Sequence, residues 1–202
     1  HFPPLPFIGE IEPAPPGYIN FYLDPDWLVE QVNVISTEEE AYGRLDIGRG
    51  QTALVKFVSA NPTGPLTVGR GRGGVMGDTL ANLLTAAGYE TDREYYFNNA
   101  GRQMEILGNS IRLRYLELLG QEIEFPDDHY QGDYIQEIAA ELHAEHGDAL
   151  TEAEVTVFKD YAEAVIFTDI RATLARINIF FDNYFNEDSL LESGKVWETL
   201  DA

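Results

Sequence analysis

Short apolar runs alternate with helical periodicity in the first half of this chain. Residues 52–59 form a run rich in β-branched and aromatic residues, which predicts a strand, and the lack of clean alternation predicts burial on both faces. Residues 69–87 predict a helix that ends before Gly88, and residues 91–97 predict a second strand. This order indicates a βαβ unit over residues 50–101. The apolar side expected on the helix consists of Val75, Leu80, Leu83, Leu84 and Ala87.

Helical periodicity dominates the second half. Residues 101–119 and 157–177 each carry an apolar stripe, and a further helix is expected to begin near Gly132. Residues 180–185 predict another strand, and residues 193–202 predict the start of another helix. Stripes of this kind are typical of core. Their members are Met104, Leu107, Ile111, Tyr115 and Leu118, then Ile135, Ile138 and Leu142, then Val157, Tyr161, Val165, Ile170, Leu174 and Ile177.

The N-terminal part has a different pattern. Residues 1–16 are rich in proline, which predicts an extended linker or an edge strand. Residues 18–23 predict a strand, and a helix is expected to begin with Asp24 as its N-cap and Pro25 at its first position. An acidic stretch that then contains glycine predicts a domain boundary within residues 36–49.

Composition narrows the class of protein. The 202 residues are enough for one domain or one and a half, and the 44% of hydrophobic residues can form a core. No apolar run is long enough for a membrane span, and no basic-then-apolar leader is present. The absence of cysteine fits a reducing compartment, so we expect a cytoplasmic location. His143 and His146 have no carboxylate placed to complete a metal site, so none is predicted.

The charge balance is strongly acidic. Thirteen Lys and Arg residues stand against 35 Asp and Glu residues, which gives a net charge of −22. Because phosphate neutralisation supplies most nucleic-acid affinity, the chain is expected to repel RNA on average. Binding to RNA would require a local cluster of basic residues or other parts of the protein. The balance also suits a salt-adapted organism or ordinary solubility.

The turn between the first strand and helix carries the clearest candidate chemistry. Residues 61–65 read NPTGP, and this loop precedes a glycine-bearing helix start, a geometry that can place backbone N–H groups against phosphate. Arg70 and Arg72 lie in the first turn, where the helix dipole disfavours cations, so an anion is expected nearby. The alternative is an ordinary βα unit with glycines for close packing. Residues 69–74 form neither a Walker A loop nor a complete G-x-G-x-x-G fingerprint.

A second polar cluster follows the second strand. Asn98 and Asn99 come at its carboxyl end, where ligands bind in open parallel sheets. The same pair is also typical of a simple turn.

Longer motifs identify a family. Residues 59–73, SANPTGPLTVGRGRG, strongly resemble the signature of arginyl-tRNA synthetases, which are class I aminoacyl-tRNA synthetases. The match extends to residues 76–84 and 95–103. Further similar pieces make the resemblance cover nearly the whole chain: residues 109–120, 132–135 and 181–190.

The resemblance implies the architecture. We expect an α/β fold, a Rossmann-like parallel-sheet half-domain of the HUP type with a helical insertion. Residues 1–40 are expected to end an amino-terminal tRNA-binding domain and linker, and residues 41–202 to form the first half of a class I catalytic domain. Its expected parts are a βαβ core at 50–101, helical segments at 101–178, and a strand and helix start at 179–202. The second half-sheet, the lysine-bearing ATP loop and the anticodon-binding domain have no counterpart here.

The resemblance also implies a function. The family ligates arginine to its tRNA in protein biosynthesis, through an arginyl-adenylate made from ATP with Mg²⁺. The expected partners are arginine, ATP, the arginine tRNA, mainly through parts missing from this chain, and the remainder of the synthetase; no membrane is expected. Such an enzyme positions its reactants and stabilises charge on phosphate with preorganised donors. This chain is expected to supply part of the site and to be inactive alone.

The resemblance assigns site residues by position. Thr67 and Arg70 occupy the two signature histidine positions and are the expected catalytic residues. The expected substrate-binding residues are Lys56, Ser59, Asn61, Asn99 and Gln103. The expected ATP-binding residues are Thr67, Gly69, Arg70 and Gly71.

Three positions depart from the family pattern. Thr67 is shorter than histidine and neutral, and Arg70 is longer, although it can grip phosphate with a forked guanidinium. Lys56 stands where the family usually carries a glutamate that helps to recognise arginine. At a wet surface, two like charges about 4 Å apart repel by roughly 1 to 4 kcal/mol. A catalytically degenerate binding or regulatory module is therefore the alternative. A generic nucleotide-binding domain is a third possibility, but it would have no reason to carry both the NPTGP loop and the asparagine turn.

Overall fold

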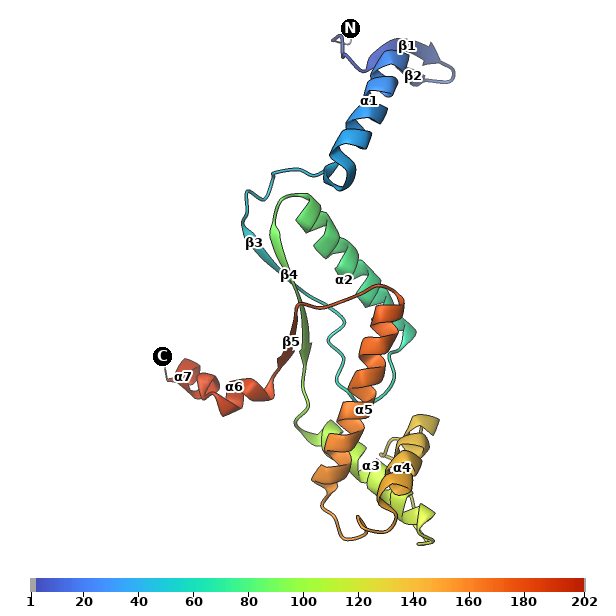
Figure 1. Cartoon of the computed structure of the whole chain (residues 1–202), viewed down its shortest axis with the longest axis vertical. Helices are drawn as coiled ribbons and strands as arrows, with labels where there is room; N and C mark the ends of the chain where they lie inside the picture. The colour runs from blue at the N-terminus through green and yellow to red at the C-terminus, as the bar shows by residue number, and fades with distance from the viewer. Residues whose placement is uncertain (1–2, 202) are drawn as a thin grey trace. The chain divides into compact units, whose positions relative to one another are not determined.

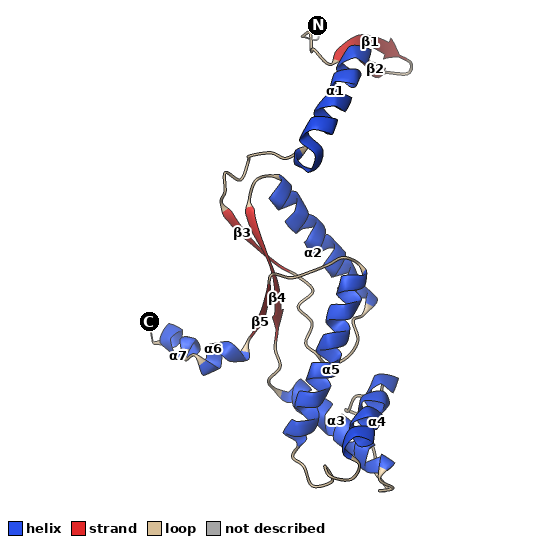
Figure 2. Ribbon diagram, viewed as in Figure 1, coloured by secondary structure: helices blue, strands red, loops and turns tan. Residues whose placement is uncertain are grey.

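The computed structural model describes residues 3–201 and divides into two compact units between Ile47 and Gly48. Figure 1 traces the chain from its N-terminus to its C-terminus, and Figure 2 marks its helices and strands. Within the described residues, no helix is both long enough and apolar enough to cross a lipid bilayer. Each unit is described by itself below.

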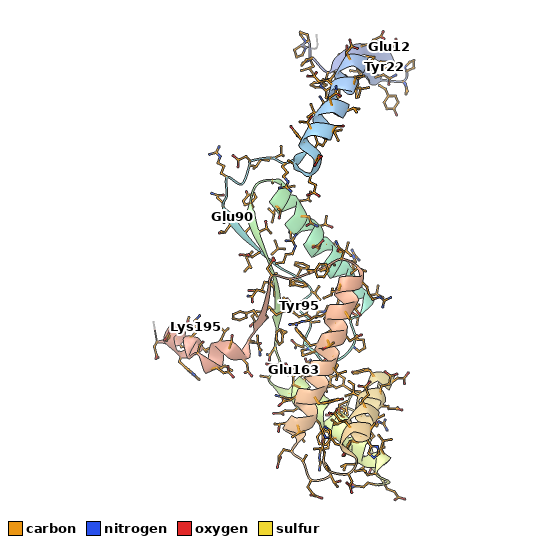
Figure 3. All side chains as sticks on the ribbon, in the orientation of Figure 1. Glu12, Tyr22, Glu90, Tyr95, Glu163 and Lys195 are labelled. Atoms are coloured by element: carbon orange, nitrogen blue, oxygen red, sulfur yellow. The ribbon has the colours of Figure 1, made fainter. Side chains whose placement is uncertain are left out.

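The first unit is a β-hairpin followed by a helix. Its elements are β1 (Ile8–Ala14), β2 (Tyr18–Leu23), α1 (Pro25–Glu38) and a short 3₁₀ helix, η1 (Glu39–Ala41). The strands pair antiparallel, and Tyr22 Oη donates to Glu12 Oε2 across the hairpin at 3.2 Å (Figure 3). Asp24 Oδ1 accepts from the backbone N–H groups of Asp26 and Trp27, and Pro25 opens the helix. The predicted β2 strand and N-cap are confirmed.

The second unit is built on a parallel sheet. Its elements are β3 (Thr52–Lys56), α2 (Val68–Ala86), β4 (Glu90–Phe97), α3 (Arg102–Leu118), α4 (Asp133–His146), α5 (Val155–Arg176), β5 (Asn183–Asn186), α6 (Asp188–Glu192) and α7 (Lys195–Leu200). The strand order is β3-β4-β5, with Thr52 opposite Glu90 and Glu94 opposite Asn183. Helix α2 packs on β3 and β4, and α3 packs on both α4 and α5. The expected α/β architecture with a helical insertion is confirmed.

The apolar side predicted for α2 is only partly correct, because Leu84 packs against the core whereas three of the other residues are exposed. Val75, Leu80 and Leu83 are 54%, 50% and 63% exposed. The buried side carries small residues instead, because the helix approaches the sheet very closely: a Cβ at Gly77 would overlap the Phe57 ring. Small side chains therefore let α2 lie against β3, and Val75, Leu80 and Leu83 are left exposed. The buried α2 residues are Gly74 and Ala81.

The core lies mainly among β4, α3, α4 and α5, where most stripe residues are buried as predicted. Leu118 is an exception and is half-exposed. On α5 the predicted face is partly wrong, since Val157 and Ile177 are exposed. The helix carries two adjacent apolar rows, and the row that faces α3 begins at Phe158. Its buried members are Phe158, Ala162, Ile166, Ile170 and Leu174.

The first and third strands of the sheet are shorter than predicted. β3 ends at Lys56 because the chain turns into a left-handed conformation two residues later. β3 is an edge strand whose second face is not covered: Leu54 is 62% exposed, so the predicted burial on both faces is wrong. β5 begins only at Asn183, and the preceding Phe180 is exposed.

Candidate functional site

The loop after β3 and the first turn of α2 enclose a cavity of about 310 Å³. It lies beyond the carboxyl ends of β3 and β4, where ligands bind in open parallel sheets. Five of the expected site residues line this cavity: Ser59, Asn61, Thr67, Arg70 and Gln103. The rest of the lining comes from the loop itself: Ala60, Thr63, Gly64, Pro65 and Leu66.

The loop begins with an unusual backbone conformation. Val58 and Ser59 have φ values of 57° and 47°, in the left-handed region that a β-branched residue rarely adopts. Ser59 Oγ accepts from the backbone N–H of Tyr96 at 3.1 Å and donates to the carbonyl of Phe57 at 3.2 Å. The serine hydroxyl therefore ties the loop to β4 just past the end of the β3 ladder.

The side-chain amide of Asn61 is oriented by the turn after β4. Its Oδ1 accepts from the backbone N–H of Asn98 at 3.0 Å, and its Nδ2 donates to Gln103 Oε1 at 3.2 Å. Asn98 itself forms a local turn, because its Oδ1 accepts from the backbone N–H of Ala100 at 2.8 Å. The asparagine pair therefore lies in a turn, and that turn orients a residue of the cavity.

Thr67 and Arg70 are engaged within the protein. Thr67 is the N-cap of α2, and its Oγ1 accepts from the backbone N–H of Arg70 at 3.4 Å. Arg70 Nη1 donates to the carbonyl oxygen of Val58 at 3.0 Å. Around Gly69 and Gly71 the helix start is open, since a Cβ at Gly71 would meet no atom within 4 Å. The first turn of α2 thus presents backbone, a hydroxyl and a guanidinium at one place.

Lys56 and Asn99 do not line this cavity. Lys56 Nζ lies 5.3 Å from the centroid of the Tyr96 ring, a cation–π contact on the sheet. Asn99 Nδ2 donates to Glu163 Oε1 on α5 at 3.0 Å. Of the predicted substrate-binding residues, the structure therefore brings together Ser59, Asn61 and Gln103 and leaves these two outside.

Glu163 was not found by sequence reasoning. Burial raises the pKa of this carboxyl above its usual value, and the hydrogen bond from Asn99 partly opposes that rise. It lines a second cavity of about 460 Å³ on α5, together with Asp160, Ala164, Phe167, Thr168 and Arg171. Nothing in the sequence distinguishes it from the other acidic residues of an amphipathic helix.

Two tyrosines that hold the loop were also missed. Tyr95 Oη donates to the carbonyl of Ala60 at 2.8 Å and accepts from its N–H at 3.2 Å. Tyr134, on α4, donates from Oη to the carbonyl of Thr63 at 2.8 Å. Burial raises the pKa of each phenol to about 12, so both remain protonated donors. Both tyrosines lie in segments that resemble the family, residues 95–103 and 132–135, but the sequence assigned neither of them a role.

Among residues 3–201, no group of three or more His, Cys, Asp or Glu side chains is placed to hold a metal ion. The two histidines weighed in the sequence, His143 and His146, lie near the end of α4. His143 packs edge-on against the Tyr115 ring, with centroids 5.8 Å apart.

A family model and the curated relatives of this chain agree with each other. A family model described as the catalytic domain of class I tRNA synthetases (R) matches residues 31–163. The chain is 55% identical over 186 residues to an arginine–tRNA ligase of Chlorobium phaeobacteroides, covering 92% of this chain and 34% of that protein. It is 56% identical over 187 residues to the arginine–tRNA ligase of Chlorobaculum tepidum, with the same coverage. The chain spans about a third of the length of these relatives.

Solved structures agree in fold. A crystal structure described as an arginyl-tRNA synthetase of Campylobacter jejuni matches with a TM-score of 0.79 and 34% identity, over 89% of this chain and 40% of that one. The arginyl-tRNA synthetase of Thermus thermophilus matches with a TM-score of 0.53 and 25% identity, over 98% of this chain and 33% of that one. Because the family model covers well over half of the sequence and the sheet has the same fold, the chain belongs to the arginine-specific family of class I tRNA synthetases.

Proposed function

We propose that this chain supplies part of the arginine and ATP site of an arginine–tRNA ligase. The observation that carries the proposal is the cavity at the carboxyl ends of β3 and β4, which gathers Asn61, Thr67, Arg70 and Gln103 beside a helix N-terminus. Helix N-termini favour anions through their free N–H groups and dipole, and the guanidinium adds a second source of positive charge.

The reaction proposed for the whole protein has two steps. In the first, an oxygen of the arginine carboxylate bonds to the α-phosphorus of ATP, the bond to the β-phosphate oxygen breaks, and pyrophosphate leaves with the electron pair. In the second, a ribose hydroxyl of the tRNA attacks the activated carbonyl and AMP leaves. The first turn of α2 and Arg70 would stabilise negative charge on the phosphates, and Mg²⁺ would arrive with ATP.

The polar groups of the loop suit an amino-acid substrate. Asn61 and Gln103 share one hydrogen bond and keep further donor and acceptor capacity toward the cavity. The position of Lys56 also supports arginine as the substrate, because its ammonium lies against Tyr96 rather than in the cavity. The repulsion expected from this departure would then act at a distance from the bound guanidinium.

The remaining assignments follow the family. We propose residues 1–40 as the end of an amino-terminal tRNA-binding domain with its linker, and residues 41–202 as the first half of the catalytic domain. With a net charge of −22, this chain would leave most of the tRNA contact to other parts of the synthetase. A cytoplasmic location remains a prediction.

The test is arginine-dependent ATP–pyrophosphate exchange in the whole synthetase that contains this chain, measured with the arginine tRNA present. Arg70→Ala is expected to lower kcat/KM about a hundredfold, which is the usual range for removing one donor that stabilises developing charge. Arg176→Ala, at the exposed end of α5, removes the same kind of side chain away from the cavity and is expected to leave the rate unchanged. Absence of arginine-dependent exchange in the unmodified protein would contradict the proposal.

The alternative is a synthetase-derived binding module. The observation in its favour is that both signature positions bond internally: Thr67 caps α2 and Arg70 binds the Val58 carbonyl. The double variant Thr67→His with Arg70→His separates the two functions. An unchanged or higher exchange rate supports the ligase, whereas ATP binding without exchange in every variant supports the module.

A further inference from the structure

The loop that lines the cavity is held in a conformation that its own residues disfavour. Val58 and Ser59 are consecutive non-glycine residues in the left-handed region, and Val58 is β-branched. Such backbone persists only where the surrounding structure determines it. The contacts that fix this turn therefore also fix where Ser59 and Asn61 lie in the cavity.

Tyr95 makes the most direct of these contacts. Its hydroxyl donates to the Ala60 carbonyl at 2.8 Å and accepts from the Ala60 N–H at 3.2 Å, so one side chain satisfies both polar groups of that residue. Ala60 lies between the strained pair and Asn61, and it lines the cavity. Tyr95 itself does not line the cavity and so acts only through the backbone.

The ring of Tyr95 is fixed in the core. It is 0% exposed and contacts four aromatic rings: Phe97, Phe167, Phe181 and Tyr184. Figure 3 shows Tyr95 on β4, between the sheet and α5. Burial raises the pKa of its phenol to about 12, so the hydroxyl keeps its proton throughout the physiological range. The donor to the loop is therefore rigid and always present.

We propose that Tyr95 is a positioning residue for adenylate formation, because its hydroxyl clamps Ala60 and so keeps the strained Val58–Ser59 turn in the form that presents Asn61 to the cavity. This rests on the proposed function of the cavity. A shift of the loop would displace Asn61, because its hydrogen bonds to Asn98 and Gln103 require the loop to stay beside β4 and α3.

The chain contains a matched control. Tyr115 is also 0% exposed, and its hydroxyl also bridges backbone groups, donating to the Gly147 carbonyl at 2.6 Å and accepting from the Leu150 N–H at 3.3 Å. These partners belong to the helical region and not to the cavity. Tyr95→Phe and Tyr115→Phe therefore delete the same chemical group from equally buried sites.

The experiment compares these variants in the whole synthetase, with the arginine tRNA present in every exchange assay. Both are expected to shift the urea midpoint similarly, but only Tyr95→Phe should lower kcat for arginine-dependent ATP–pyrophosphate exchange, by about tenfold to a hundredfold, as small misplacements at a reacting centre do. Amide hydrogen exchange across residues 57–62 should accelerate only in Tyr95→Phe. Adding Val58→Gly to Tyr95→Phe should recover part of kcat, because glycine adopts positive φ without the steric cost. It should still lower stability further, because Val58 is buried and its side chain is lost from the core.

Each result decides the proposal. Equal kcat losses in the two tyrosine variants, or unchanged hydrogen exchange at residues 57–62 in Tyr95→Phe, would overturn it. If the unmodified protein shows no arginine-dependent exchange, the proposed function fails, and the part played by Tyr95 in holding the loop is still decided by the hydrogen-exchange comparison with Tyr115→Phe.

Discussion

The guanidinium of Arg70 donates to the carbonyl oxygen of Val58 at 3.0 Å, and this bond joins the first turn of α2 to the strained turn after β3. A carbonyl oxygen partly offsets the unfavourable position of a cation at a helix N-terminus. The bond uses one of the five N–H donors of the guanidinium, so the others remain able to meet an anion in the cavity. A residue that departs from the family pattern is thereby also part of the local structure.

Arg70→Met tests how much the hydrogen bond from Arg70 to the Val58 carbonyl contributes to stability. Methionine keeps an unbranched side chain but removes the donor to Val58, so unfolding free energy is expected to fall by about 1 kcal/mol, the net worth of one hydrogen bond. Urea unfolding of the chain measures the difference. Arg72→Met, on the same turn and with an exposed side chain, is the control and should change stability by less than about 0.5 kcal/mol. Equal losses of unfolding free energy in the two variants would contradict a stabilising role for the hydrogen bond between Arg70 and Val58.

Thr67→Ala should weaken the start of α2. The Thr67 hydroxyl accepts from the Arg70 N–H at a long 3.4 Å, so the loss is expected near the lower end of the range for N-caps, about 0.5 to 1 kcal/mol. Thr67→Ser keeps the acceptor and should restore most of that stability. Urea unfolding distinguishes the two variants; a serine variant as unstable as the alanine variant would show that the methyl group, and not the cap, matters.

Glycine positions on α2 are expected to respond in opposite directions. A Cβ at Gly77 would overlap the Phe57 ring, so Gly77→Ala should destabilise the chain by about 1 to 3 kcal/mol through overpacking. Gly73 has no atom within 4 Å of a built Cβ, and Gly73→Ala should stabilise the helix by up to about 1 kcal/mol through its higher helix propensity. Thermal or urea unfolding of the two variants measures whether each substitution lowers or raises stability. A destabilising Gly73→Ala would contradict the packing described for α2.

These glycines show why hydrophobic periodicity could not predict every buried face of the fold. Periodicity located α3 and α4, because their stripes contain large apolar side chains that face the core. The strands β2 and β4 were located by their β-branched and aromatic residues, although β2 is exposed along its whole length. Periodicity misplaced part of the buried side of α2, where close approach to Phe57 excludes any side chain at Gly77 and so reverses the usual pattern. The cavity residues Asn61, Thr67 and Arg70 came from the family motif. Tyr95 could not be found from the sequence, since its hydroxyl acts on Ala60, 35 positions away along the chain.

Glu163 should make stability depend on pH in the weakly acidic range. Burial raises the pKa of its folded-state carboxyl above the unfolded value, despite the hydrogen bond from Asn99. A carboxyl whose pKa is higher in the folded than in the unfolded protein stabilises the fold fully at pH values below the unfolded pKa. This contribution to stability is lost as the pH rises through the folded pKa. The unmodified chain should therefore lose stability relative to Glu163→Gln over that window. Lys159, Asp160 and Asp188 also act on this carboxyl, so unfolding of both proteins is compared across the same pH series.

The control for this comparison is Glu141→Gln, on α4, for which the same substitution is made at an exposed position. It should leave the pH profile of stability parallel to that of the unmodified chain. A profile for Glu163→Gln that also runs parallel would mean that burial does not disfavour the charged form of the Glu163 carboxyl.

The outward side of α2 should make the isolated 202-residue chain self-associate. Val75, Leu80 and Leu83 recur at helical spacing on that side and are each at least half exposed, and the edge strand β3 adds unpaired backbone groups. Sedimentation velocity at increasing concentration is expected to show a rising average mass despite the net charge of −22. Leu83→Glu should shift that rise to higher concentration, because it places a charge in the apolar row. Glu90→Gln changes a charge on the neighbouring strand β4 without touching the row and should leave association unchanged. A monomer at every concentration would show that this side of the helix does not drive association.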